Sequence, residues 1–245
     1  MNAPSCKRSS AVDALDSFGA RIQVQVELQG TSASDEQLAT LRHLPKLTSL
    51  NLAKTNVTDA GLRHLEQISE LERLYLCDTA IGDEGMKHLK RLRKLTHLDL
   101  DRTRVSDTGL KRAMWLLNLR SLGLAGTSIS DRGMRYVGRF SNLEQLRIDH
   151  TSITDAGLTW LKRLVKLQEL DLSRTSISDA GLTAISGLKR LRYLGLESTN
   201  TSDAGLAHLA ALAALAQVKA QGTGISQAGL AMLASTVASV RIKEH

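Results

Sequence analysis

A short alternation of apolar and polar residues recurs along almost the whole chain. In the segment 47–70, Leu50 and Leu52 alternate with polar neighbours, the two-residue period of a strand that is buried on one face. A stripe of apolar residues at three-residue spacing follows, as in a short helix packed on one side; it consists of Leu62, Leu65 and Ile68. The segment therefore predicts a strand, a turn and a helix.

This unit repeats every 24 residues without interruption. One of its positions holds nine threonines: Thr31, Thr55, Thr79, Thr103, Thr127, Thr151, Thr175, Thr199 and Thr223. Each threonine closes a strand where the chain turns, so its hydroxyl can bond to the backbone of that turn while its methyl group faces the core. A constant period of this length predicts a stack of like units, with successive strands paired in parallel in one elongated domain.

The helix of each unit begins in a short polar motif. In the segment 47–70 the motif reads Thr58-Asp59-Ala60-Gly61-Leu62, and its side chains can accept hydrogen bonds from the open N–H groups of the first helical turn. The aspartate recurs at the same period: Asp35, Asp59, Asp83, Asp107, Asp131, Asp155, Asp179 and Asp203.

The two ends of the chain depart from the repeat. The first unit is degenerate, with Gln37 where later units have glycine, and apolar residues spaced by three or four upstream of it predict a helical cap. Val240 and Ile242 predict a terminal edge strand. We therefore expect a polar N-terminal tail and helical cap over 1–22, a domain of nine 24-residue repeats over 23–238, and a C-terminal edge strand and tail over 239–245.

The full pattern, LxxLxLxxTx[IV][ST]DxGLxxLxxLxx, resembles the leucine-rich repeat superfamily. The TDAGL motif at Thr58–Leu62 and Thr154–Leu158 is similar to the bacterial 24-residue type of repeat. Similar repeats occur in F-box-associated and pathogen effector proteins. The resemblance implies an α/β fold, a right-handed solenoid with a curved parallel sheet on its concave face and short helices on its convex face. It also implies a scaffold that binds a protein partner, although members of the family differ in partner. In this chain threonine occupies the repeat position at which other members often have a row of hydrogen-bonding asparagines.

Side chains that alternate with the buried strand leucines should project from the concave face. One central unit offers only small residues there, Ser121, Gly123, Ala125 and Gly126, which predicts a notch with charged walls. A partner side chain or loop can enter this notch; alternatively, its charges only pair across neighbouring strands. The candidate partner-binding residues are Tyr75, His97, Asp99, Asp101, Arg102, Arg147, Asp149, His150, Asp171, Arg174 and Tyr193.

The same face contains acid and base side chains, but the motifs of an enzyme do not accompany them. No serine or cysteine nucleophile stands in a known motif context, and no metal-ligand spacing appears. We expect no catalytic activity, no cofactor and no metal.

The chain carries a net charge of +7, and its positive residues gather between each helix and the next strand. Stacking of the units should align them in a stripe, here called the basic edge; it includes Lys90, Arg91, Arg93, Lys94, Lys162, Arg163 and Lys166. The alternative function is therefore an adaptor that binds nucleic acid or an anionic surface through this edge. Lysine and arginine also favour helix C-termini without any ligand, and only 3% of residues are aromatic, so we expect a protein partner and not nucleic acid.

Three aromatic residues, Trp115, Tyr136 and Trp160, fall at outward positions of successive units. They predict either groove-filling between neighbouring helices or an interaction patch on the convex side.

Cysteine usage and the chain ends bear on location. The chain has only Cys6 and Cys77, far apart in the sequence, and no apolar run typical of a secretion signal or of a membrane span. We expect a cytoplasmic monomer. The alternative is a bacterial effector that is secreted by a non-classical route into a host cell.

Overall fold

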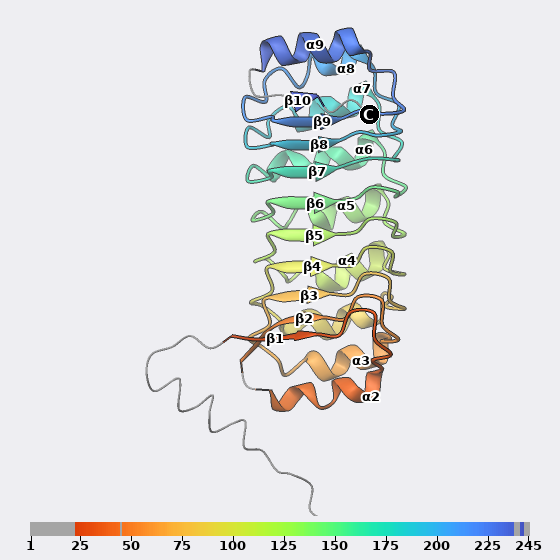
Figure 1. Ribbon diagram of the computed structural model, residues 1–245, viewed down its shortest axis with the longest axis vertical. Coiled ribbons are helices and arrows are strands. Elements are labelled where there is room, and N and C mark those ends of the chain that lie inside the picture. Colours follow the sequence, from red (N-terminus) through yellow and green to blue (C-terminus); the bar gives the residue numbers. More distant parts are fainter. Residues whose placement is uncertain (1–22, 45, 238–240, 243–245) are drawn as a thin grey trace, which may run out of the picture.

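The computed structural model describes residues 23–44, 46–237 and 241–242. Its strands form one parallel sheet in chain order (Figure 1). They are β1 (Val24–Glu27), β2 (Leu47–Asn51), β3 (Arg73–Tyr75), β4 (His97–Asp99), β5 (Ser121–Gly123), β6 (Gln145–Arg147), β7 (Glu169–Asp171), β8 (Tyr193–Gly195), β9 (Gln217–Lys219) and β10 (Arg241–Ile242). The helical cap expected within 1–22 lies outside the described residues.

A short helical segment follows the strand in each unit up to β9. The α-helices are α2 (Asp35–Leu38), α3 (Asp59–Leu62), α4 (Asp107–Ala113), α5 (Asp131–Val137), α6 (Asp155–Leu158), α7 (Asp179–Leu182), α8 (Asp203–Leu206) and α9 (Gln227–Thr236). The 3₁₀ helices are η1 (Leu41–His43), η2 (Arg63–Leu65), η3 (Gly85–Arg91), η4 (Thr159–Arg163) and η5 (Thr183–Ile185). None of these helices, in the part of the chain that the structure describes, has the length and apolar character needed to cross a bilayer.

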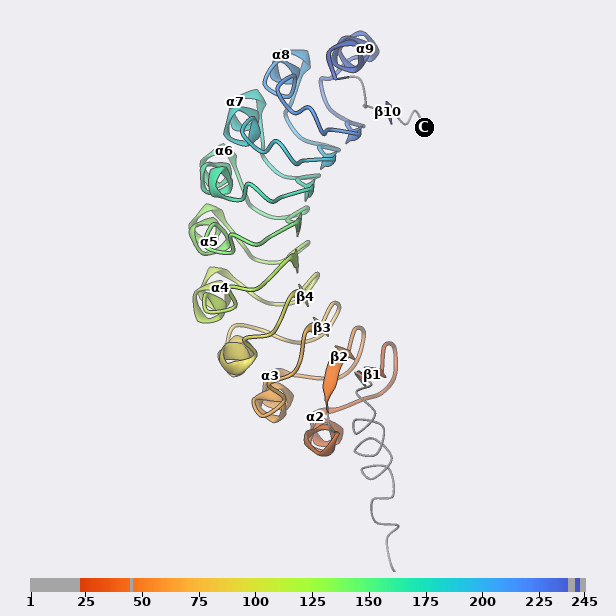
Figure 2. The same ribbon diagram turned by 90° about the vertical axis from the view of Figure 1, so that its left-hand side faces the viewer.

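The register of the sheet aligns equivalent positions of the units. Leu74 pairs with Leu50 on one side and with Leu98 on the other, so the central leucines form one continuous row. The sheet lies on the inner side of the curve and the helices on the outer side (Figure 2). This arrangement confirms the predicted fold class.

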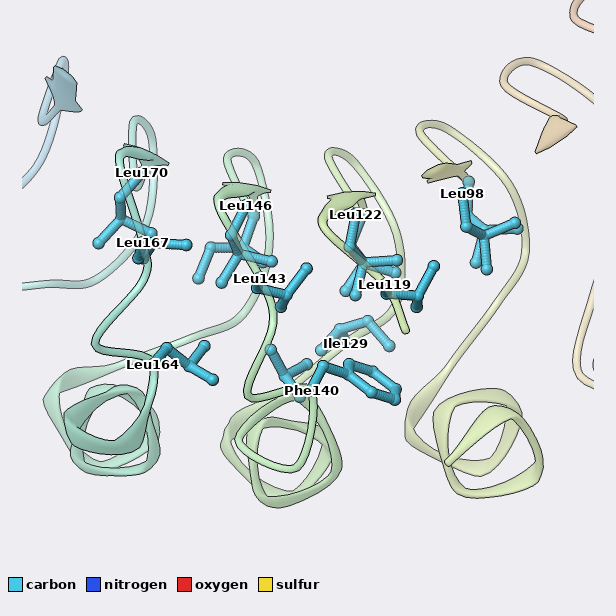
Figure 3. Close-up of a cluster of buried hydrophobic side chains, with 14 of the residues drawn as sticks. Leu98, Leu119, Leu122, Ile129, Phe140, Leu143, Leu146, Leu164, Leu167 and Leu170 are labelled. Carbon is cyan, nitrogen blue, oxygen red and sulfur yellow. The ribbon is translucent and has the colours of Figure 1, made fainter. Parts of the chain in front are cut away.

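The core lies between the sheet and the helices and runs the length of the stack. Leucines from the strands meet residues from the segments behind them, among them the fully buried Phe140 (Figure 3). Since the helical segments before α9 are only a turn or two long, they are stabilised by this packing and not by their own propensity.

Each threonine of the repeat closes its own turn. The Thr55 hydroxyl donates to the carbonyl oxygen of Leu52 at 2.7 Å, and the same bond to the residue three positions earlier recurs at all nine threonines, from Thr31 to Thr223. Most of these hydroxyls are buried, so the bond gives each of them an acceptor away from water. At Leu28, Leu100, Leu124 and Leu196 the same carbonyl oxygen also accepts from the backbone N–H of the threonine.

The polar motif at the helix start divides its work between two residues. Serine or threonine is the N-cap, as at Thr154, whose side chain accepts from the N–H of Ala156. The aspartate that follows bonds instead to the next unit: Asp131 accepts from the N–H and the hydroxyl of Thr154 at 2.8 and 2.6 Å. This aspartate ladder runs from Asp35 to Asp203. The sequence predicts a capping role for both residue types, and the structure shows that the aspartates join the units.

A second row of special positions follows the strands. One residue after each of the strands β1 to β9 has a positive φ, between 54° and 71°. These nine residues lie three positions beyond the last residue of their strand. They are Gly30, Lys54, Asp78, Arg102, Gly126, His150, Arg174, Ser198 and Gly222. We call them the left-handed turn positions; they set the direction in which the chain leaves the sheet.

Candidate functional site

A hollow of about 370 Å³ opens on the inner face of the sheet, over β3 to β8. Its lining consists of the strand residues whose side chains project from the concave face into solvent, together with the edges of the central leucines between them. This concave hollow is lined by Tyr75, His97, Leu98, Asp99, Ser121, Leu122, Gly123, Gln145, Leu146, Arg147, Glu169, Leu170, Asp171 and Tyr193.

The shape of the hollow follows from side-chain size. β5 contributes only Ser121 and Gly123 to its floor, whereas Tyr75 on β3 and Tyr193 on β8 stand at its two ends. Five strand spacings separate these tyrosines, about 24 Å at ~4.8 Å for each spacing. The small central residues lie where the sequence predicts a notch.

Arg147 spans the middle of the hollow. Its Nη2 atom on β6 lies 3.1 Å from Asp99 Oδ2 on β4 and 2.6 Å from Asp101 Oδ2. To reach them the guanidinium passes over β5 at Gly123, where a β-carbon would lie 2.8 Å from Arg147 Nη2 and 2.5 Å from Asp101 Oδ1. The missing side chain of Gly123 therefore makes this ion pair possible.

Asp101 is the buried member of the group, with 6% of its surface exposed. Burial, followed by repulsion from Asp99, raises the pKa of Asp101 to about 6, against the opposing effects of Arg147 and of the Ala125 N–H, which donates to Asp101 Oδ1 at 2.9 Å. A carboxylate with this pKa gains or loses its proton close to neutral pH.

The end of the hollow at β7 and β8 is arranged differently. Asp171 Oδ1 accepts from the N–H of Ser173 at 3.0 Å, and its Oδ2 lies 3.4 Å from the Tyr193 hydroxyl. Burial, then the charges of Asp171 and Glu197, raises the pKa of Tyr193, so its phenol stays protonated. Lys219 Nζ lies 5.7 Å from the centre of the Tyr193 ring.

The hollow gathers six of the predicted partner-binding residues: Tyr75, His97, Asp99, Arg147, Asp171 and Tyr193. Asp101 is buried and is not among the lining residues, but it is ion-paired with Arg147, which is. Arg102, His150 and Arg174 occupy left-handed turn positions beyond the strand ends, and Asp149 precedes one of these turns.

Two of the predicted residues outside the hollow, Arg102 and His150, contact acidic side chains nearby. Arg102 makes a two-pronged ion pair with Asp78, with Nε–Oδ1 and Nη2–Oδ2 distances of 2.5 and 2.6 Å. His150 Nδ1 lies 3.0 Å from Asp149 Oδ2. Gln145 and Glu169 line the hollow but are absent from the predicted set. They share the sequence column of His97 and Tyr193, so counting 24 residues from either predicted residue would have found them.

The two histidines of the predicted set do not share the hollow. His97 Nδ1 lies 2.8 Å from Thr96 Oγ1, and burial, with the nearby charges of Arg73 and Arg120, lowers the pKa of His97. The other candidate, His150, is not among the lining residues. Among the described residues, no three or more His, Cys, Asp or Glu side chains are placed to hold a metal ion.

The seven residues of the basic edge are all exposed, but they form two groups. Lys94 pairs with Glu70 at 2.6 Å, and Lys166 Nζ donates to Asn142 Oδ1 at 2.7 Å. Between the groups the chain places the exposed apolar residue Leu117 and the indole of Trp115.

Of the three convex aromatics, Trp115 and Trp160 are about 40% exposed. Tyr136 packs against the core with the Arg135 guanidinium 4.6 Å from its ring centre. Groove-filling therefore describes Tyr136 better than it describes the two tryptophans.

Comparison with known proteins agrees with this architecture. Leucine-rich repeat family models match residues 141–200, and 43–65 and 91–112. No curated protein shows significant sequence similarity to the chain. Among solved structures, internalin C2 from Listeria monocytogenes is similar over 86% of this chain and 84% of its own, with 28% identity and a TM-score of 0.64. The repeat motif, the stacked parallel strands and these matches together show that the chain is a leucine-rich repeat protein.

Proposed function

We propose that the protein is a non-catalytic scaffold that binds a protein partner in the concave hollow. The observation that carries the proposal is the hollow itself, which combines two tyrosines, an arginine and carboxylates over a floor of small residues. Tyrosine and arginine are enriched among residues that dominate binding energy. Because the strands are held in register along both sides, the hollow is formed before a partner arrives, which lowers the entropy cost of binding.

The biological setting that we propose is bacterial. The repeat wording is of the bacterial type, and the similar internalin C2 comes from a bacterium. The protein acts there as a monomeric adaptor in the cytoplasm, or as an effector that reaches a host cell by a non-classical route. Protease accessibility in intact and in fractionated cells of the source organism tests the compartment.

Filling the hollow tests the proposed function. Ser121→Tyr places a large side chain on the floor, in the sequence column where β8 already holds Tyr193, so we expect the fold to accept it. Ser141→Tyr, at an exposed loop position outside the hollow, is the matched control. Partners captured by the wild-type chain and by the control should be lost with Ser121→Tyr at an unchanged melting temperature. Equal capture by all three chains would refute the hollow as the binding site.

The alternative function uses the basic edge to bind nucleic acid or an anionic surface. It has less support, because the edge is divided into two groups by Trp115 and Leu117. Phosphate binding weakens steeply as salt rises, so titration of a DNA duplex at low and at physiological ionic strength tests it. A steep salt dependence that disappears in Lys162→Gln/Arg163→Gln/Lys166→Gln would move the function to this edge.

A further inference from the structure

The carboxylates in the concave hollow share an arginine at one end and have no ion-pair partner among the described residues at the other. In the β4–β6 part, Arg147 is shared by Asp99 and Asp101. At the β7 end, Glu169 and Asp171 place two carboxylates on the same strand, and neither makes an ion pair with any described residue. Glu169 is exposed, and no described side chain donates a hydrogen bond to it.

Two cations on the neighbouring strands are already engaged. Arg147 turns toward β4, and Lys219 lies over the ring of Tyr193. The hydroxyl of Tyr193 lies 3.4 Å from Asp171 Oδ2, and Tyr193 lines the hollow together with the two carboxylates. Carboxylates form their strongest hydrogen bonds with charged donors, and an aromatic ring attracts a cation over its face. The β7–β8 end thus has the groups that bind a cationic side chain.

We propose that Glu169, Asp171 and Tyr193 form a subsite for a lysine or arginine side chain of the partner protein. The inference rests on the proposed function and specifies the chemistry of that partner. An acidic side chain is the poorer fit, because it would meet these carboxylates at one end and would compete with Asp99 and Asp101 for Arg147 at the other.

The net charge of the whole chain limits how basic the bound segment of the partner can be. A protein of net charge +7 repels a strongly basic segment at long range, so the subsite favours an isolated basic residue in a neutral or acidic segment. An extended segment spanning about 24 Å at ~3.3 Å per residue has about seven residues. The expected ligand is a segment of this length with one lysine or arginine.

The repeat itself supplies variants that remove the two charges without disturbing the sheet. The column of Glu169 contains Gln145 and Gln217, so Glu169→Gln has a precedent in the same chain. The column of Asp171 contains Asn51, whose side-chain oxygen accepts from the N–H of Ala53 as Asp171 accepts from Ser173. Asp171→Asn therefore keeps the local hydrogen bond. Glu70→Gln/Glu84→Gln removes the same charge from exposed sites elsewhere and is the control.

The test selects ligands from a library of peptides with about seven random positions, displayed against the full-length chain. Selected peptides should share one lysine or arginine. Replacing an arginine by citrulline, which has nearly the same shape without the charge, should weaken binding on the order of tenfold or more, as measured by fluorescence anisotropy. Glu169→Gln/Asp171→Asn should lose the same factor for the arginine peptide and almost nothing for the citrulline peptide.

The remaining outcomes separate this inference from the proposed function. Peptides that Ser121→Tyr displaces but that lack a basic residue, or that bind Glu169→Gln/Asp171→Asn unchanged, would overturn the basic subsite and leave the scaffold function intact. If Ser121→Tyr displaces no selected peptide, both proposals fail. Glu169→Arg, which has a precedent in Arg73 of the same column, should shift selection toward acidic peptides; an unchanged preference would also overturn the inference.

Discussion

At the scale of single residues, the glycine in β5 has a specific electrostatic role. Glycine inside a strand normally weakens it, because no side chain packs there. Here the open space above Gly123 lets Arg147 reach two carboxylates on the far side of β5, one of them buried. Without Arg147, the buried Asp101 carboxylate would destabilise the fold by much more than the loss of side-chain packing at Gly123 does.

Gly123→Ala should therefore destabilise the protein. The added β-carbon would lie 2.5 to 2.8 Å from Asp101, Asp99 and Arg147, so the ion pair must shift, at a cost of about 1–3 kcal/mol. Gly187→Ala is the control, since its β-carbon meets nothing within 4 Å and should be neutral or slightly stabilising. Urea denaturation of both variants measures the difference; equal midpoints would contradict the role assigned to Gly123.

Asp101 should make the stability of the protein depend on pH. Its pKa is about 6 in the folded chain and close to 3.8 when unfolded, so between these values the folded state binds more protons. Stability from this group is present at low pH and is lost as pH rises toward 6, by up to about 3 kcal/mol. The free energy of unfolding of the wild-type chain minus that of Asp101→Asn should fall between pH 4 and pH 6 and then level off. A difference that stays flat over this range would exclude the raised pKa.

At the scale of elements, the aspartate ladder ties each helix start to the next. It also explains the glycine of the TDAGL motif: a β-carbon at Gly157 would lie 2.5 Å from Asp131 Oδ1 of the preceding unit. The degenerate first unit fits this account, because Ala11 stands 26 residues before Gln37, where later units have aspartate. Glycine and aspartate are thus a pair formed across two units.

A double-mutant cycle tests this pairing. Asp131→Ala loses two hydrogen bonds to Thr154, and Gly157→Ala crowds the carboxylate, each at about 1–3 kcal/mol. In the double variant the carboxylate is gone, so the added β-carbon no longer crowds it. We expect the double variant to lose at least about 1 kcal/mol less unfolding free energy than the sum of the two single losses. Additive costs in thermal or urea unfolding would show that Ile153 and Met134, which also border the site, decide the outcome.

The sequence predicts the features that lie within one unit and the parallel pairing of successive strands, but it misses the side-chain contacts that join units. The strand leucines, the closing threonines and the helix start at Asp59 all follow from local period and residue type. The partner of each aspartate depends on how far one unit is displaced from the next, which the period along the chain does not record. The same limit applies to the site, where the bridge from Arg147 to Asp101 crosses a whole strand.

At the scale of the whole molecule, stability is shared between neighbouring units. Each unit has one strand and a short helix, and it buries its leucines against the units on both sides. Stacks of this kind behave as a chain of nearest-neighbour interactions, so a local defect is felt mainly by the adjacent units.

Leu122→Ala, in the middle of the row of central leucines, should cost about 2–5 kcal/mol. Amide hydrogen exchange should lose protection in β4, β5 and β6, while β9 keeps most of its own. Leu117→Ala is the matched control, because that side chain is 45% exposed and should cost far less. Uniform loss of protection along the sheet would show that the stack unfolds as a single cooperative unit.

The left-handed turn positions connect stability with surface chemistry. Glycine adopts a positive φ without strain, yet six of the nine positions hold other residues, among them Arg102, His150 and Arg174. Each of these residues carries backbone strain that a glycine would relieve. Glycine at all three would relieve about 1–2 kcal/mol of strain at each position, more than the exposed contacts of Arg102 with Asp78 and of His150 with Asp149 contribute. The scaffold should therefore become more stable while three charged or ionisable groups are lost from the rim of the hollow, where these turns lie beyond the strand ends. A gain in melting temperature that coincides with a loss of partner affinity would identify this rim as a region where the protein trades stability for recognition.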